Sequence, residues 1–141
     1  MFFDISAEVH SPAPNYQGLI DAIAREVRAR RGRIVSTASG SLEFRSPFLN
    51  WGLLQGVTFG NVRSERQDAG FIVYYRLSIA PTRYLLILYI VVGIVGGAAE
   101  GNLFSVLIAV IAGPLFYQLN RVMASILFRR LVRRAATLAA T

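Results

Sequence analysis

The sequence of 141 residues contains no cysteine and no lysine, and its single histidine is His10. Without cysteine, disulfides and thiolate metal sites are excluded, and His10 has no obvious partners for a metal site. A Walker phosphate-binding loop requires a lysine, so that motif is excluded as well. Nothing resembles the Gly-x-Ser-x-Gly elbow of a nucleophilic serine. We therefore predict a protein that is not an enzyme and that holds no metal or cofactor.

Charge is also scarce, because only 16% of the residues are charged while 54% are hydrophobic. No charged residue lies between Arg83 and Glu100, or between Glu100 and Arg121. A helix needs roughly 20 apolar residues to cross the hydrocarbon core of a bilayer. The two uncharged stretches therefore predict a transmembrane hairpin, residues 81–120, with helices over about 81–99 and 102–120.

The arginines predict how this hairpin is oriented. They flank its two open ends, whereas the connection around Glu100 has none. By the positive-inside rule, both termini lie in the cytoplasm. The segment Met1–His10 lacks a basic start and is not predicted to be a signal peptide. The arginines assigned to topology or to anionic lipid headgroups are Arg83, Arg121, Arg129, Arg130, Arg133 and Arg134.

Most of the excess positive charge belongs to the membrane part of the chain. The whole sequence has a net charge of +7, of which residues 81–141 contribute +5, with six arginines and one acid. Residues 1–80 have nine arginines and seven acids, a net of +2. A nucleic-acid-binding domain is expected to carry a basic face with stacking aromatic residues. We therefore predict no nucleic-acid partner. Because all basic residues are arginine, as in many high-GC bacterial genomes, we predict a bacterial inner membrane protein.

Residues 1–80 show the patterns of a small α+β domain. An alternation of period two begins at Phe3, and helical spacing follows from about Tyr16 to Arg31, with Gly32 as the expected stop. Further strands are predicted over 33–37, 41–46, 56–66 and 71–79. The order is β-α-β-β-β-β, which indicates one helix across a face of a mostly antiparallel sheet.

The segment Ser46–Leu54 combines a helix-start signal with large apolar residues. Two interpretations stay open for it. The segment packs into the domain core, or it forms an interfacial loop that rests on lipid headgroups, where tryptophan is favoured. The second interpretation assigns the anchor to Phe48, Trp51 and Leu54.

Small residues recur at helical spacing in the predicted hairpin. Such residues let membrane helices approach closely. They serve either packing within the hairpin or association with another membrane helix, and both uses are compatible. The predicted helix-packing residues are Gly93, Gly96, Gly97, Gly101, Ala109 and Gly113.

Residues 121–141 have the pattern of a basic amphipathic helix. Apolar residues fall on one side and the arginines largely on the other. Such a helix lies at the membrane interface, either binding anionic lipid or acting only as a topology anchor. The apolar side consists of Leu127, Phe128, Leu131, Ala135 and Leu138.

Three functional hypotheses follow from these features. The leading one is a non-enzymatic membrane protein that acts as a homo-oligomer or as an accessory subunit of a larger membrane complex. The second is a homo-oligomeric channel or membrane-disrupting effector that is gated by its cytoplasmic domain. In it, Tyr89, Ser105, Tyr117 and Gln118 would line a pore and Pro114 would kink its helix. The third is a membrane protein that senses a lipid or small ligand.

Overall fold

The structure is a computed structural model that describes residues 4–11, 16–47, 57–68 and 70–140. Within these ranges the strands are β1 (Asp4–Ser11), β2 (Arg33–Ala38), β3 (Ser41–Arg45), β4 (Phe59–Gln67) and β5 (Gly70–Ser78). The helices are α1 (Tyr16–Ala29), α2 (Ala80–Ala99) and α3 (Leu103–Ala140). The chain therefore combines an antiparallel sheet with two long apolar helices.

The five described strands form one sheet in the order β1-β5-β4-β3-β2, with every neighbouring pair antiparallel. The chain runs back and forth from β2 to β5, and β1 then pairs with β5 so that Ala7 lies opposite Tyr75. The β2–β3 turn contains Gly40 at φ 78°, which a residue without a side chain adopts readily. The β2–β3 pair also contains a register shift between Ile34 and Ser36.

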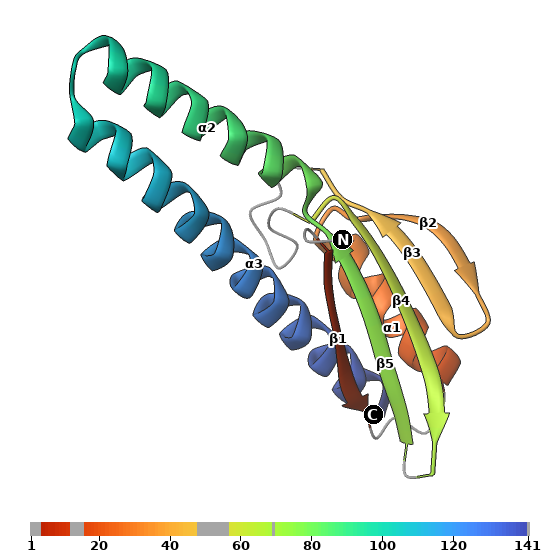
Figure 1. Cartoon of the computed structure of the whole chain (residues 1–141). Helices are drawn as coiled ribbons and strands as arrows, with labels where there is room; N and C mark the ends of the chain where they lie inside the picture. The colour runs from red at the N-terminus through yellow and green to blue at the C-terminus, as the bar shows by residue number, and fades with distance from the viewer. Residues whose placement is uncertain (1–3, 12–15, 48–56, 69, 141) are drawn as a thin grey trace.

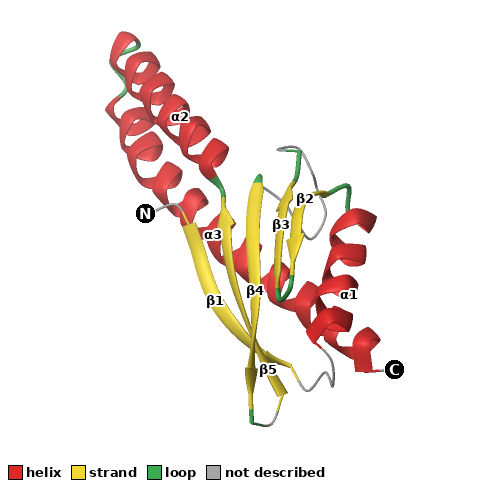
Figure 2. Ribbon diagram, turned by 90° about the vertical axis from the view of Figure 1, so that its right-hand side faces the viewer, coloured by secondary structure: helices red, strands yellow, loops and turns green. Residues whose placement is uncertain are grey.

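One face of the sheet is covered by helices and the other is open (Figure 2). Every second residue of β5 is buried, as shown by Val73, Tyr75 and Leu77, whereas Tyr74 and Arg76 on the opposite face are exposed. This is the period of two that a sheet with one solvated face requires. The helix α1 contributes its apolar stripe to the same core, from Leu19, Ile20, Ile23 and Val27.

The C-terminal half of α3 covers this face beside α1, which corrects two predictions. The sheet was expected to carry one helix, but two cover it, and residues 121–140 continue α3 without a break. The expected amphipathic tail is therefore not a separate interfacial helix. Of its predicted apolar side, Phe128, Leu131 and Ala135 are buried in the domain core together with Val132, whereas Leu127 is half-buried and Leu138 is 52% exposed. Packing against the sheet removes the apolar area of the buried side chains from water.

The end of α1 also differs from the prediction. The helix ends at Ala29, and Arg31, not Gly32, has the left-handed backbone conformation, at φ 63°. The amide of Gly32 donates to the carbonyl of Val27 at 2.9 Å, and that of Arg31 to the carbonyl of Arg28 at 3.0 Å. These bonds form a Schellman motif, which satisfies carbonyls left free at the helix end.

Candidate functional site: an apolar helical hairpin and its junction with the sheet

The helices α2 and α3 form an antiparallel hairpin that projects from the sheet domain (Figure 1). Its turn is a second Schellman motif, in which Gly101 has φ 67° and the amide of Asn102 donates to the carbonyl of Gly97 at 2.8 Å. The side-chain oxygen of Asn102 then accepts bonds from the amides of Phe104 and Ser105, at 3.1 and 3.2 Å. Asn102 thus caps α3, and a three-residue connection reverses the chain.

Small residues allow the two helices to approach each other closely. A Cβ atom on Gly93 would lie 2.3 Å from the Cβ of Ala109, and one on Gly97 would lie 2.8 Å from Val106. A Cβ on Gly113 would lie 3.0 Å from the side chain of Leu86. Gly93, Gly97, Ala109 and Gly113 are therefore used within the hairpin. The remaining two predicted residues are placed elsewhere, since Gly101 forms the turn and a Cβ on Gly96 would meet nothing within 4 Å.

The outer surface of the hairpin consists of large apolar side chains. On α2 the exposed ones include Leu85, Leu88, Val92 and Val95, and on α3 they include Leu103, Phe104, Leu107, Ile111, Leu115, Phe116 and Leu119. Water-soluble proteins rarely expose contiguous apolar patches larger than a few hundred Å². Both helices are long and apolar enough to cross a membrane.

The four polar residues considered for a pore do not share one face. Tyr117 is buried and Ser105 is half-buried, whereas Tyr89 and Gln118 are exposed. Pro114 lies inside α3, and the helix continues through it to Ala140.

The base of the hairpin carries two half-buried arginines, Arg83 on α2 and Arg121 on α3. The guanidinium of Arg83 lies 4.8 Å from the ring centroid of Tyr84 and donates to its hydroxyl at 3.2 Å. Tyrosine is enriched at membrane–water interfaces, and arginine near the end of a membrane helix can extend its charged group to the interface.

Below the base, α3 is joined to the sheet by an aromatic cluster. The ring of Phe128 stacks on Phe44 of β3, with centroids 5.9 Å apart, and packs against Tyr75 of β5 at 4.8 Å. The Tyr75 hydroxyl lies 3.4 Å from the Ser125 hydroxyl and accepts a bond from Nε of Arg129 at 3.2 Å. Polar and apolar contacts together therefore fix α3 on the sheet.

The sequence patterns did not identify most of this junction. Phe44, Tyr75 and Gly60 fall within the predicted strands 41–46, 71–79 and 56–66, but the strand patterns assign no role to any of the three. A Cβ on Gly60 would lie 2.2 Å from the Phe44 ring, so the absence of a side chain there makes room for that ring. A glycine inside an alternating strand is the one signal that indicated such a close approach.

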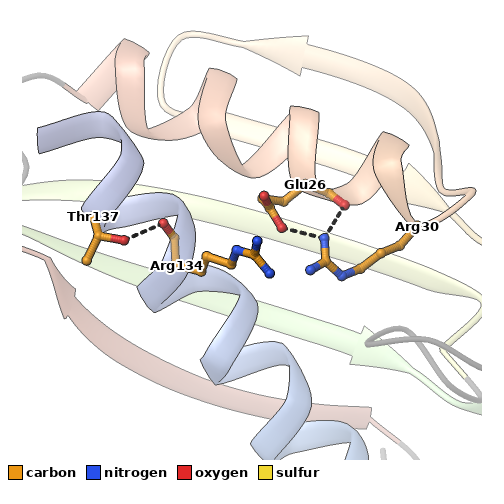
Figure 3. Close-up of polar contacts among 4 residues, drawn as sticks. All are labelled: Glu26, Arg30, Arg134 and Thr137. Carbon is orange, nitrogen blue, oxygen red and sulfur yellow. Dashed lines mark hydrogen bonds and ion pairs between the residues drawn. The ribbon is translucent and has the colours of Figure 1, made fainter. Parts of the chain in front are cut away.

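Four arginines lie along the part of α3 that packs on the sheet, and all four are exposed. They are Arg129, Arg130, Arg133 and Arg134. Figure 3 shows Arg134 reaching into the seam between α1 and α3, toward Glu26 and Arg30. Arg30 forms an ion pair with the Glu26 carboxylate and also donates to the Glu26 carbonyl at 2.9 Å.

The remaining predicted site residues give no further site. The candidate anchor of Phe48, Trp51 and Leu54 lies outside the described residues. Among the residues that are described, no three His, Asp or Glu side chains gather as metal ligands, and His10 is exposed. Comparison with protein-family models, with curated proteins and with solved structures finds no match for this chain.

Proposed function

We propose that this chain is a non-enzymatic integral membrane protein that works as a subunit of a membrane assembly, in a bacterial inner membrane. The observation that carries the proposal is the hairpin. Most of its small residues pack between α2 and α3, and its outer surface presents large apolar side chains to the surroundings. Such a surface is stable in lipid or against other membrane helices, and it would aggregate in water.

The arginines favour one orientation. Arg83 and Arg121 mark the cytoplasmic boundary, and the turn at Glu100–Asn102 faces the outside. The sheet domain is then cytoplasmic. It is held against the bilayer without a flexible linker, because a single residue, Ile79, separates the end of β5 at Ser78 from the start of α2 at Ala80.

The rigid connection supports an accessory or scaffolding role. The helix α3 runs through the hairpin and into the domain core without interruption. A helix rises about 1.5 Å per residue, so its 38 residues extend about 57 Å. Any partner that binds the hairpin would thereby fix the position of the sheet domain as well.

Single cysteines test the orientation cleanly because the natural chain has none. In intact cells, Asn102→Cys should react with a membrane-impermeant thiol reagent. Ser36→Cys, on an exposed position of β2, should react only after the membrane is permeabilised. Labelling of Asn102→Cys from the inside only, or release of the chain by alkaline carbonate, would contradict membrane insertion in this orientation.

The subunit role is tested by extraction from native membranes in mild detergent, followed by measurement of the mass of the particle. A particle heavier than the 15.5 kDa chain with its detergent is expected. A monomer that carries no other protein would contradict the proposal.

A further inference from the structure

The outward side of α3 carries one continuous row of exposed residues that crosses the membrane boundary. We call it the α3 stripe, and it consists of Leu115, Leu119, Val122, Ile126, Arg129 and Arg133. Successive members are alternately four and three residues apart, which is the spacing of a coiled-coil seam. Val122 and Ile126 are 54% and 43% exposed although they follow the boundary residue Arg121. The row therefore has apolar members on both sides of the boundary and ends in arginines.

The basic end of the stripe is electrostatically unbalanced. The whole of α3 contains no Asp or Glu, and Arg130 extends the basic end beside Arg129 and Arg133, whereas Arg134 points toward Glu26 of α1 (Figure 3). Arg129 and Arg133 are four residues apart, where like charges destabilise a helix. An acidic surface placed against this end would remove that repulsion.

Lipid headgroups do not reach the last arginines of the stripe when the hairpin spans the bilayer. Arg130 and Arg133 come 9 and 12 residues after Arg121 on a continuous helix. At about 1.5 Å per residue they lie about 14 and 18 Å beyond the boundary. The headgroup layer is only about 5–8 Å thick on each side. Arg133 is thus well outside the headgroup layer.

A second copy of the chain is a poor match for the stripe. Two copies inserted in the same membrane have the same orientation, so their α3 helices would pair in parallel. Parallel pairing would bring the Arg129 and Arg133 side chains of both copies to the same level. Like charges at facing positions disfavour that pairing.

We propose that the α3 stripe binds the helix of a different membrane protein, and that this helix continues beyond the bilayer with Asp or Glu opposite Arg129, Arg130 and Arg133. The inference rests on the proposed function, since it requires an inserted hairpin. Apolar contacts up to Ile126 and carboxylate–guanidinium pairs beyond it would give the partner both its register and its orientation.

Co-reconstitution with synthetic helices in phosphatidylcholine vesicles tests the inference. One probe is a polyleucine span followed by a helical extension rich in glutamate, and the matched probe has glutamine in place of glutamate. A donor dye on Ala140→Cys and an acceptor on the extension report binding by energy transfer. The glutamate probe should bind on the order of tenfold more tightly, because several exposed ion pairs add together.

The double variant Arg130→Gln with Arg133→Gln should abolish this preference. It leaves Arg129, which bonds to Tyr75, in place. The matched control, Arg45→Gln with Arg63→Gln, removes the same charge from the exposed side of the sheet and should keep the preference. Equal binding of both probes, or equal loss in the control, would overturn the inference. Failure of the chain to insert into the vesicles would instead contradict the proposed function.

Three further outcomes would also overturn the inference. A chain carrying Ile126→Cys should form no disulfide-linked dimer on oxidation, and efficient dimer formation would show that a second copy occupies the stripe. Anionic phosphatidylglycerol added to the vesicles should not displace the glutamate probe. Short duplex DNA should not bind to the arginines in place of the probe.

Discussion

The two halves of α3 differ in the side chains that they bury. In residues 103–120 the buried positions are the small residues Ala109 and Gly113 and, next to the base of the hairpin, Tyr117, while most large apolar side chains face outward. In residues 121–140 the large side chains Phe128 and Leu131 are buried, and arginines face outward. In lipid, close approach of small residues stabilises a helix pair, whereas in water burial of apolar area does. A helix that passes from lipid into a protein core in water is expected to show this difference between its two halves.

The comparison also shows that the core of the sheet domain is not continuous in the sequence. The same buried cluster contains residues of α1, of β3 to β5 and of α3 from Tyr117 to Ala136. The hairpin is inserted between the last strand and the helix that completes the core. Residues 1–80 alone would lack the α3 side chains that complete this core.

Truncation after Asn120 is expected to have the largest effect, which is loss of the folded domain. Several buried side chains would be removed, and each is worth about 2–5 kcal/mol in a core. Their sum reaches the total stability of a small domain, about 5–15 kcal/mol. Amide hydrogen exchange should show unprotected strands. The reverse variant, with residues 84–118 replaced by a short Gly-Ser linker, should remain folded and soluble. Protected strands after truncation would contradict this division of the core.

Replacement of Phe128 by alanine should destabilise the domain by about 3–5 kcal/mol, because its ring fills the space between Phe44 and Tyr75. Leu119→Ala removes a large apolar side chain from the other half of the same helix, where it is exposed. That change should leave the domain's unfolding midpoint unchanged. The stability of both variants is measured by urea unfolding in mild detergent, with amide-exchange protection of β4 and β5 as the readout. Equal destabilisation by Phe128→Ala and Leu119→Ala would contradict the difference in burial between the two halves of α3.

In the hairpin, Gly93→Ala should push the helices apart and cost about 1–3 kcal/mol, as overpacking does in a close contact. Gly96→Ala is the matched control, because its added Cβ meets nothing within 4 Å. Energy transfer between dyes at positions 84 and 119 reports separation of the helices during titration with SDS. Restoration of the contact by Ala109→Gly would confirm that the clash is local. Equal loss of helix contact in Gly93→Ala and Gly96→Ala would contradict the close packing of Gly93 against Ala109.

Periodicity was sufficient to predict the antiparallel sheet and the two apolar helices, because each property repeats along the chain. It could not place the C-terminal half of α3. An apolar stripe with basic residues opposite fits a membrane interface and a sheet surface equally well. The choice depended on Tyr75 and Phe44, which lie far from Phe128 in the sequence. Local patterns also assigned the stop of α1 to Gly32, although the backbone places Arg31 in the left-handed conformation.

That last difference predicts a small effect of opposite sign to the others. The ends of α1 and α2 form the same motif, but Gly101 occupies the left-handed position in the hairpin and Arg31 occupies it in the domain. Arg31→Gly should stabilise the domain by about 0.5–1 kcal/mol, because a side chain is strained in that conformation. Arg28→Gly, within the exposed side of α1, should destabilise it by about 1 kcal/mol. Both changes remove one exposed arginine, so a difference in charge cannot explain opposite shifts in the thermal midpoint. Shifts of the same sign would contradict the strain at Arg31.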